Sequence, residues 1–226
     1  MTTDIPIITI DGLSSSGKST ISVLLAKKLG WNLLDSGLLY RAIAYLTALE
    51  SKSINDQDQI NKLMGDFKLQ TTKQSNLYRI IYKNNDITDY LNTEIVGKNA
   101  SVVSKLPFIR NLFLPIQHSC IQAPGLIANG RDMGTKVFTN ATLKLFFVAE
   151  VNIRAKRRHE QLITQGENVD FNSVLASLKA RDDADQNRSI SPLEPAHDAE
   201  IVDSSDLNIE SVLDKIYELY TISRVK

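Results

Sequence analysis

Five short runs of apolar residues recur along the chain, and each is almost continuous rather than alternating with polar positions. They lie at Ile5–Ile10, Trp31–Leu34, Gly125–Asn129, Leu143–Val148 and Glu200–Val202. Continuous apolar runs of this length are typical of strands that are covered on both faces. Helical patterns lie between them, so the alternation of strand and helix predicts an α/β fold with a doubly wound, five-stranded parallel sheet.

A different pattern occupies the stretch from about residue 68 to residue 88. Apolar or threonine side chains alternate with polar ones at Phe67, Leu69, Thr71, Tyr78, Ile80 and Tyr82. This period of two predicts strands with one buried face, and Asn84-Asn85 has the composition of a tight hairpin turn. We therefore expect a small antiparallel sheet inserted into the doubly wound domain, where insertions tend to carry substrate specificity.

Two helical patterns follow the insert, at residues 92–105 and 107–122. Pro107 suits the first turn of the second helix, whereas Pro115 lies in its interior, where proline should kink or break it. Residues 165–172 form the most polar region of the chain. Because they separate two helical patterns, we expect a mobile loop there.

The loop after the first apolar run carries the most specific chemical signal. Residues 12–19 complete the pattern G-x-x-x-x-G-K-S, and a helix is expected at Lys18–Leu29, ended by Gly30. Backbone N–H groups of such a loop bind phosphate, helped by the positive end of the following helix. Lys18 is expected to reach the β- and γ-phosphates of a nucleoside triphosphate, and the Ser19 hydroxyl to ligate Mg²⁺. The predicted nucleotide-binding residues are Gly12, Leu13, Ser14, Ser15, Ser16, Gly17, Lys18, Ser19 and Thr20.

Composition narrows the class of protein. The chain has 226 residues, enough for one α/β core with an inserted subdomain, and its 26 basic residues balance 26 acidic ones. This balance argues against a general nucleic-acid or membrane-surface binder. The single cysteine cannot form an intrachain disulfide, and the three scattered histidines have no zinc-ligand spacing. We expect a cytosolic monomer without a membrane span, and we find no residue arranged as a nucleophile.

Two further strand ends carry charged and small residues. One leads into residues 35–41, which include Ser36 and Arg41, and the other into residues 129–135, which include Arg131 and Asp132. In an open α/β sheet, ligands bind at the carboxyl ends of the strands, so both turns are expected to face the same crevice as the phosphate loop. A second anionic ligand is therefore predicted there, and the arginines offer planar forks for a phosphate.

Arginines mark the two helical patterns beside the polar loop. Arg154, Arg157 and Arg158 have the spacing i, i+3 and i+4, which predicts one shared face on which an anion would join them. Beyond the loop, Arg181, Asp185 and Arg188 recur at i, i+4 and i+7 as a second polar stripe, and Val174, Leu175 and Leu178 are expected to anchor that helix to the core. Two arginine-bearing helices joined by a loop predict a lid that closes over phosphates.

Together these motifs resemble those of the bacterial cytidylate kinase family of nucleoside monophosphate kinases. The match extends from Ile8–Gly12 to Ile201–Ser204, and its most specific parts are Leu34–Gly37 with Tyr40-Arg41, Gly130–Thr135, and Lys179–Asp183 with Asp185 and Arg188. The resemblance implies one P-loop kinase domain spanning residues 1–226. Its core would comprise residues 1–35, 107–150 and 192–226, its monophosphate-binding insert about 36–106, and its lid about 151–190.

The resemblance also implies the substrates, ATP with Mg²⁺ as donor and CMP, with dCMP, as acceptor, in pyrimidine nucleotide metabolism. It implies that Arg41, Arg131 and Arg188, helped by Ser36, hold the CMP phosphate. Cytosine would be recognised by Ser101, Arg110 and Asp132, because a carboxylate accepts from the N4 amino group that uracil lacks. Arg181 and Asp185 would contact the sugar. The implied catalytic residues are Lys18, Arg131, Arg157, Arg158 and Arg188.

Three positions depart from the pattern of the family: Leu13 replaces a usual proline, Asn129 stands where an acid often helps to hold hydrated Mg²⁺, and Leu114-Pro115 replaces residues that suit a helix. Ser19 is therefore the one metal ligand expected. Other P-loop kinases, for UMP, AMP or shikimate, remain the first alternative. A nucleotide-dependent switch or binding module is the second, although the chain lacks an Asn-Lys-x-Asp guanine-recognition string, and a structural interaction protein is the third.

Overall fold

The computed structural model describes residues 5–72, 75–206 and 208–223. The chain divides into two compact units. One contains Ile5 and residues 26–128, and the other contains residues 6–25 together with the described residues from 129 onward. Helix α1 (Lys18–Leu29) continues from the second unit into the first, and it has the bounds that the sequence predicts. Gly30, with φ of +67°, follows its end as expected.

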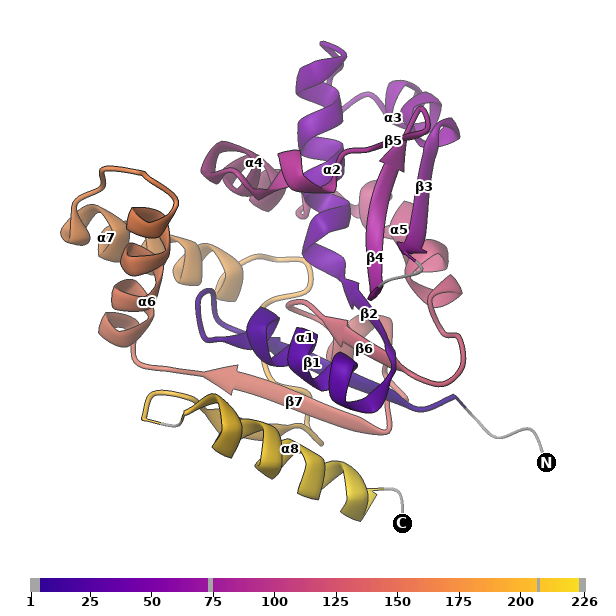
Figure 1. The fold of residues 1–226 in the computed structure, drawn as a ribbon. Helices are drawn as coiled ribbons and strands as arrows, with labels where there is room; N and C mark the ends of the chain where they lie inside the picture. The colour runs from indigo at the N-terminus through magenta and orange to yellow at the C-terminus, as the bar shows by residue number, and fades with distance from the viewer. Residues whose placement is uncertain (1–4, 73–74, 207, 224–226) are drawn as a thin grey trace. The chain divides into compact units, whose positions relative to one another are not determined.

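The second unit carries three parallel strands in the order β1, β7, β8 (Figure 1). Its elements are β1 (Ile7–Gly12), the single-turn π-helix η2 (Met133–Val137), β7 (Leu143–Val148), α6 (Val151–Thr164), α7 (Phe171–Gln186), β8 (Glu200–Asp203) and α8 (Ile209–Ser223). β1 pairs with β7 from Ile8–Leu143 to Gly12–Phe147, so both strands end at the same edge. Helix α8 packs along β7. The α/β class and the parallel pairing are confirmed.

The first unit contains strands in the order β3, β4, β2, β6, with β5 paired to β4. Its elements are β2 (Asn32–Asp35), α2 (Ser36–Leu49), α3 (Gln57–Gly65), β3 (Phe67–Thr72), β4 (Ser75–Tyr82), β5 (Asn85–Asp86), the 3₁₀ helix η1 (Thr88–Asn92), α4 (Glu94–Val103), α5 (Pro107–Ser119) and β6 (Leu126–Asn129). The predicted alternating strands are present, and β3, β4 and β5 pair in antiparallel fashion.

Two details of the insert differ from the sequence prediction. β4 also pairs in parallel with β2, at Leu33 and Leu77, so the insert extends the sheet of its unit instead of forming a separate one. The tight turn lies at Lys83-Asn84, one residue earlier than predicted, because these two residues have positive φ values of 47° and 64°. Two successive left-handed residues are what a two-residue hairpin turn of the primed type requires.

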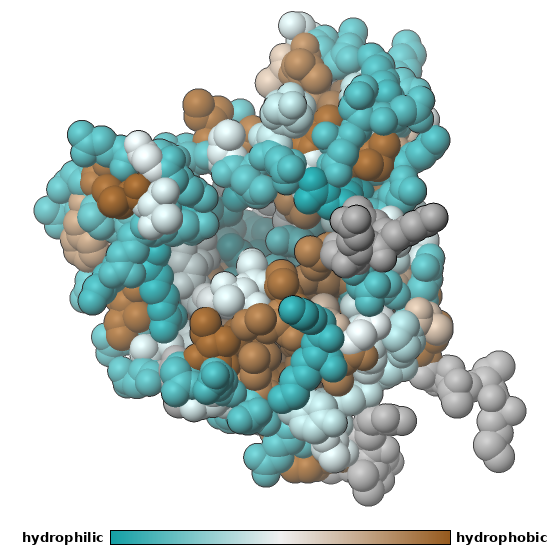
Figure 2. Space-filling model, viewed as in Figure 1, coloured by the Kyte–Doolittle hydropathy of each residue, from teal (hydrophilic) through white to brown (hydrophobic). Residues whose placement is uncertain are grey.

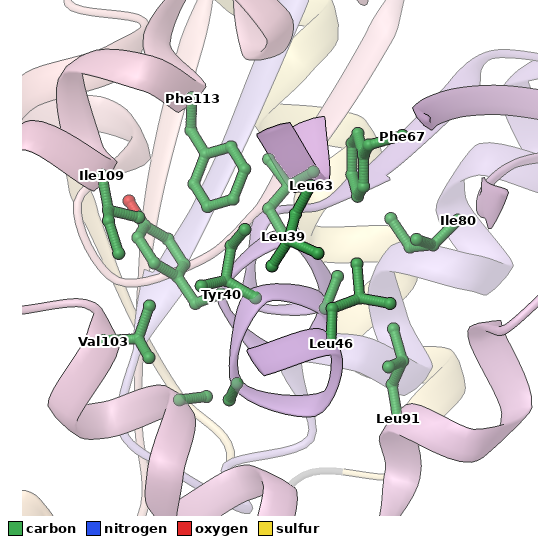
Figure 3. Packing of buried hydrophobic residues seen from close by; sticks show 14 of the residues in the cluster. Leu39, Tyr40, Leu46, Leu63, Phe67, Ile80, Leu91, Val103, Ile109 and Phe113 are labelled. Atoms are coloured by element: carbon green, nitrogen blue, oxygen red, sulfur yellow. The ribbon is translucent and has the colours of Figure 1, made fainter. Parts of the chain in front are cut away.

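A large hydrophobic cluster surrounds helix α2 in the first unit (Figure 3). Leu39, Ile43 and Leu46 of α2 are fully buried, as is Phe113 of α5. The ring of Tyr40 meets that of Phe113 edge to face, with centroids 5.2 Å apart and planes at 88°. Such a cluster holds α2 firmly, since truncating a buried leucine to alanine typically costs about 2–5 kcal/mol.

Helix α5 continues through Pro115 without interruption, so the break that the sequence suggested does not occur. Proline removes one backbone donor, but the buried face of the helix, formed by Ile109, Phe113 and Gln117, stays packed on both sides of it. The helix that begins at Pro107 ends at Ser119, close to its expected end.

Helices α6 and α7 pack against each other in the second unit, and residues 165–170 join them (Figure 1). Their contact buries Ala155, Leu162, Val174 and Leu178 in a small cluster, with Leu175 packed at its side. The apolar face of α7 therefore packs on α6, and the expectation that it anchors α7 directly to the core is wrong. On the face drawn in Figure 2, the surface over these two helices is mostly hydrophilic.

Candidate active site

The phosphate loop starts where β1 ends, at Gly12. This glycine has φ of +135°, and a Cβ atom there would lie 2.1 Å from the carbonyl oxygen of Phe147 on β7. Leu13 then donates its N–H to the same oxygen at 3.2 Å. Only glycine fits such a close approach between two backbones, so the loop is attached tightly to the end of β7.

Lys18 is held inside its own loop. Its side chain is buried, its Nζ donates to the carbonyl oxygen of Leu13, and it lies 3.5 Å from the hydroxyl of Ser16. The Ser16 hydroxyl donates to the same carbonyl at 2.9 Å. These contacts keep the ammonium group within the loop, at the N-terminus of α1, where both the charge and the helix end favour an anion.

Ser19 and Asn129 form the candidate metal position. The Ser19 residue is exposed, and the Nδ2 of Asn129 donates to its hydroxyl oxygen at 3.2 Å. Asn129 is 4% exposed, and its Oδ1 is buried and accepts no hydrogen bond from the described residues. No three His, Cys, Asp or Glu residues within the described ranges cluster as a metal site. Mg²⁺ keeps most of its water and needs few protein ligands beside phosphates, so a hydroxyl and a buried amide oxygen fit it.

The loop after β6 is held onto β1 by a buried carboxylate. Asp11 accepts the backbone N–H of Met133 at 2.9 Å and that of Gly134 at 2.8 Å. Gly134 packs so closely that a Cβ there would lie 2.9 Å from the hydroxyl of Thr9. Burial raises the pKa of Asp11 to about 6, although the two backbone hydrogen bonds oppose this rise. The residue before Gly12 thus fixes the loop that carries Arg131 and Asp132.

Two residues expected to bind substrate meet in this loop. The Nε of Arg131 lies 3.0 Å from the Oδ2 of Asp185 on α7, and its Nη1 donates to the carbonyl of Gly130 at 3.2 Å. Asp132 is buried, with 3% exposed. Fixed by Asp11 on one side and by Asp185 on the other, this loop presents its charged groups with little conformational freedom left to lose on binding.

Arg188 lies beyond the helix on which the sequence placed it. α7 ends at Gln186 and Asn187 caps it, so Arg181 and Asp185 share the helix whereas Arg188 belongs to the following segment. The predicted third member of the helical stripe is therefore wrong in its secondary structure. Arg188 is buried, and its Nε donates to the carbonyl oxygen of Ser191.

The three arginines of α6 do not share one anion-binding face. Arg154 is buried in an ion pair with Asp182 of α7, at 2.7 Å. Arg157 donates to the carbonyl oxygen of Ser204 at 2.6 Å, and Arg158 donates to Gln161 Oε1 at 3.0 Å. The spacing correctly put the side chains on neighbouring positions, but the expected convergence on one anion is wrong for Arg154, because protein atoms already occupy its donors.

The first unit contains the other expected acceptor residues, beginning with Ser36 at the N-terminus of α2. Asp35 is the cap of this helix, since its side chain accepts the N–H of Gly37 at 3.0 Å. Ser36 is buried, and its hydroxyl accepts a hydrogen bond of 2.8 Å from Gln117 of α5. Gln117 thereby orients a hydroxyl at a helix N-terminus, a position that favours anions.

Arg41 and Arg110 are both held by backbone carbonyls of the first unit. Arg41 donates to Leu91 at 2.8 Å and to Thr93 at 3.3 Å. Arg110 donates to the carbonyl of Ser104 at 3.0 Å, and its guanidinium carbon lies 5.6 Å from the centre of the Tyr40 ring.

Ser101 lies half-buried on α4, three residues before Ser104. The hydroxyl of Ser104 donates to the Ser101 carbonyl at 3.0 Å, so Arg110 and Ser101 are linked through one residue.

Comparison with known proteins decides the family. A model of the cytidylate kinase family matches residues 8–222. The chain belongs to the cytidylate kinase family. As a member of this family the chain is an enzyme, a kinase, and neither a nucleotide switch nor a structural interaction protein is favoured.

Two curated relatives show how far the similarity to this kinase extends. The chain is 44% identical over 213 residues to the cytidylate kinase of Pseudomonas fluorescens (strain Pf0-1), covering 93% of each chain. It is 43% identical over 212 residues to that of Photobacterium profundum, covering 94% of this chain and 93% of the relative. Among solved structures, an uncharacterized protein from Eubacterium ventriosum ATCC 27560 has a TM-score of 0.52 and 13% identity, covering 96% of this chain and 98% of its own, which supports the fold alone.

Sequence reasoning missed Asp11 in this kinase, although it named every neighbour of that residue. The signal was present: Asp11 follows the apolar run Ile5–Ile10 without a break, and a carboxylate at the buried end of a strand needs donors. It missed Gln117 and Asp182 as well, because their partners, Ser36 and Arg154, are far away in the sequence. No helix within the described residues is long and apolar enough to cross a membrane.

Proposed function

We propose that this kinase transfers the γ-phosphoryl group of ATP, bound with Mg²⁺, to CMP and to dCMP, giving ADP and CDP or dCDP. One observation supports this most directly. Asp11, the residue before the phosphate loop, accepts two backbone N–H groups from the loop of Arg131 and Asp132. A triphosphate-binding loop and a second loop with an arginine and a carboxylate are thus built on one strand end, as a two-substrate kinase needs.

The donor side is proposed to be the loop from Gly12 to Thr20. Its backbone N–H groups bind the phosphates, Lys18 neutralises charge on the β- and γ-phosphates, and Ser19 supplies the one protein ligand to Mg²⁺. The buried Oδ1 of Asn129 is placed to accept a hydrogen bond from water on the metal. When bound, Mg²⁺ supplies charge neutralisation on the transferring phosphoryl group.

The acceptor residues come from both units. From the first unit we propose Ser36 and Arg41 for the CMP phosphate, with Ser101 and Arg110 for the base. From the second unit we propose Arg131 and Arg188 for the phosphate, Asp132 for the N4 amino group of cytosine, and Arg181 and Asp185 for the sugar. A carboxylate that faces the O4 of uracil instead of an amino group leaves two acceptors opposed, at a cost of about 1–3 kcal/mol.

The chemical step needs no covalent intermediate. A phosphate oxygen of CMP attacks the γ-phosphorus of ATP, a P–O bond to CMP forms, and the P–O bond to ADP breaks, with charge spread over the transferred group. Lys18, Arg131 and Arg188 stabilise that charge in this proposal. Arg157 and Arg158 act from α6, exchanging their hydrogen bonds to Ser204 and Gln161 for the phosphoryl oxygens.

Three further features accompany the proposal. We infer a single kinase domain with an insert at about residues 36–106 and a lid at about 151–190, a monomer, and a cytoplasmic enzyme without nucleic-acid or membrane partners. Light scattering on purified protein tests the second of these, and a mass twice that of one chain would contradict it.

Initial rates with different acceptors test the proposed function. ADP release from ATP is measured with CMP, dCMP, UMP, AMP and shikimate, each at several concentrations, in the presence of Mg²⁺. We expect kcat/KM for CMP and dCMP to exceed that for UMP at least tenfold, with no rate above background for shikimate. Higher kcat/KM for AMP or UMP, or ADP release that ignores the acceptor, would overturn the proposal.

A further inference from the structure

Arg154 is the most deeply buried arginine of α6, and it contacts three separate segments of the second unit. Its Nε donates to the carbonyl oxygen of Ala149 at 2.8 Å, at the start of α6. Its Nη1 lies 3.2 Å from the carbonyl oxygen of Ser14 in the phosphate loop and 2.7 Å from Oδ2 of Asp182 on α7. One guanidinium group therefore joins the phosphate loop to α7.

Burying this charge is costly unless it serves its partners well. Arginine is rarely buried in full, and a desolvated ion pair can be neutral or unfavourable in comparison with apolar packing. The guanidinium plane is rigid, so its donors keep fixed directions relative to one another. A displacement of the Ser14 carbonyl is therefore passed to Asp182 rather than absorbed by rotation about a flexible stem.

Asp182 depends on Arg154 for its position. Its side chain is 13% exposed, and its other oxygen, Oδ1, is buried and accepts no hydrogen bond from the residues that the structure describes. Asp182 is adjacent to Arg181 and three residues before Asp185, and Asp185 holds Arg131 at 3.0 Å. The position of the Asp182 carboxylate is thereby connected to three groups of the proposed acceptor side.

A second connection runs beside the first. The hydroxyl of Ser204, after the end of β8, donates to the carbonyl oxygen of Ser16 at 2.8 Å, and Arg157 donates to the Ser204 carbonyl. Two carbonyls of the phosphate loop, those of Ser14 and Ser16, are thus tied directly or through Ser204 to arginines of one helix. Arg154 extends its connection to α7 through Asp182.

We propose that Arg154, through Asp182, is a positioning residue that couples occupation of the phosphate loop by a triphosphate to CMP binding by Arg181 and Asp185. The proposal rests on the function proposed above, because it takes CMP as the second ligand. Triphosphate binding orders the loop and, through Ser14 and the fixed guanidinium, fixes α7 in the position that binds the acceptor. Coupling of this kind is reciprocal, so CMP also tightens triphosphate binding by the same factor.

Calorimetric titration of the full chain tests this coupling. The dissociation constant for CMP is measured with and without a saturating, non-hydrolysable ATP analogue and Mg²⁺. For the natural sequence we expect the analogue to tighten CMP binding by roughly 5–150-fold, the usual range of coupling between two sites. In Arg154→Lys and in Asp182→Asn we expect this ratio to fall at least fivefold, and in the double variant to fall no further, because both act on one connection.

The control is the ion pair of Arg79 with Asp86, 2.8 Å apart in the first unit and outside the proposed machinery. Arg79→Lys should leave the coupling ratio unchanged. If Arg154→Lys and Asp182→Asn lower the unfolding temperature but keep the ratio of the natural sequence, Arg154 is merely structural and the proposal is overturned. Asp182→Asn preserves volume and one oxygen, so it keeps the test valid if Arg154→Lys does not fold.

Two outcomes separate this proposal from the function on which it rests. A natural sequence that phosphorylates CMP but shows a coupling ratio of one overturns the coupling alone. A natural sequence that neither binds nor phosphorylates CMP overturns both.

Discussion

The carboxylate of Asp11 accepts the backbone N–H of Gly134 at 2.8 Å, although 123 positions separate the two residues in the sequence. Asp11 stands immediately before the phosphate loop, whereas Gly134 belongs to the loop that carries Arg131 and Asp132. A single buried side chain therefore sets the distance between a donor loop and a loop with acceptor-type groups. This relationship makes Asp11 a positioning residue that touches neither proposed substrate.

Replacing Asp11 with asparagine should lower the activity without removing any proposed substrate contact. The amide group offers one oxygen, so one of the two N–H groups loses its acceptor, at a cost of about 1–3 kcal/mol. We expect kcat/KM for CMP to fall about 5–150-fold, with a smaller effect on binding of the ATP analogue. Steady-state kinetics and calorimetry measure the two quantities, and a variant with natural kinetics would contradict the role.

The raised pKa of Asp11 predicts how stability depends on pH. Because burial raises this pKa to about 6 from 3.8, the folded chain holds a proton that the unfolded chain releases between these values. The stabilisation is therefore complete below pH 3.8 and is lost as pH rises through 6. Relative to Asp11→Asn, the natural sequence should lose about 2 kcal/mol of unfolding free energy between pH 4.5 and 7.

Urea unfolding of both proteins across that pH range measures this difference. The remaining titratable groups are common to both chains, so their contributions cancel when the two are subtracted. A difference that stays constant, or that grows with pH, would show that Asp11 is ionised throughout.

Lys18→Ala should lose most of the turnover. Removing one preorganised cation from a transferring phosphoryl group costs about 10²–10³ in kcat, by analogy with the loss of a single oxyanion donor. Because Lys18 is buried, its unfolding temperature must be checked beside the kinetics. A folded Lys18→Ala protein with kcat within fivefold of the natural value contradicts the donor assignment.

Asp132→Ala should mainly change the preference for the base. If the carboxylate accepts from the N4 amino group, its loss should reduce the ratio of kcat/KM for CMP over UMP about 5–150-fold. Asp132→Asn serves as the control for volume, since Asp132 is buried, and the amide can face either base. An unchanged ratio in the alanine variant would exclude this carboxylate from base recognition.

Asn129→Asp tests the metal position beside Ser19. A carboxylate there restores a negative charge next to the Ser19 hydroxyl, which Asn129 contacts at 3.2 Å. We expect Mg²⁺ to be needed at several-fold lower concentration, both for half-maximal rate and for binding of a fluorescent ATP analogue at equilibrium. Asn85→Asp, an exposed asparagine of the first unit, should change neither. Equal Mg²⁺ requirements in all three proteins would place the metal elsewhere.

Local patterns predicted the strands well because the apolar runs are nearly continuous, and a strand that is covered on both faces leaves no other interpretation. Leu143–Val148 has its predicted bounds. The β2–β4 pairing could not be predicted, because Leu33 and Leu77 are far apart in sequence and no local pattern specifies which strands become neighbours.

Helical spacing predicted the positions of the arginines but not their partners. Arg154, Arg157 and Arg158 do lie within one helix, but the sequence cannot say whether a face is covered by solvent or by another helix. Asp182, which pairs with Arg154, comes 28 positions later and is brought near by the packing of α6 on α7. The end of α7 at Gln186, which leaves Arg188 outside the helix, likewise depends on a cap that the stripe pattern ignores.

Product analysis of a single reaction tests the central claim most directly. ATP, Mg²⁺ and CMP are incubated with the purified chain, and all nucleotides are separated and quantified over time. Phosphoryl transfer to CMP predicts that CDP and ADP appear in equal amounts while ATP and CMP disappear together. ADP without CDP, or CDP formed more slowly than UDP from UMP in a parallel reaction, would contradict the account.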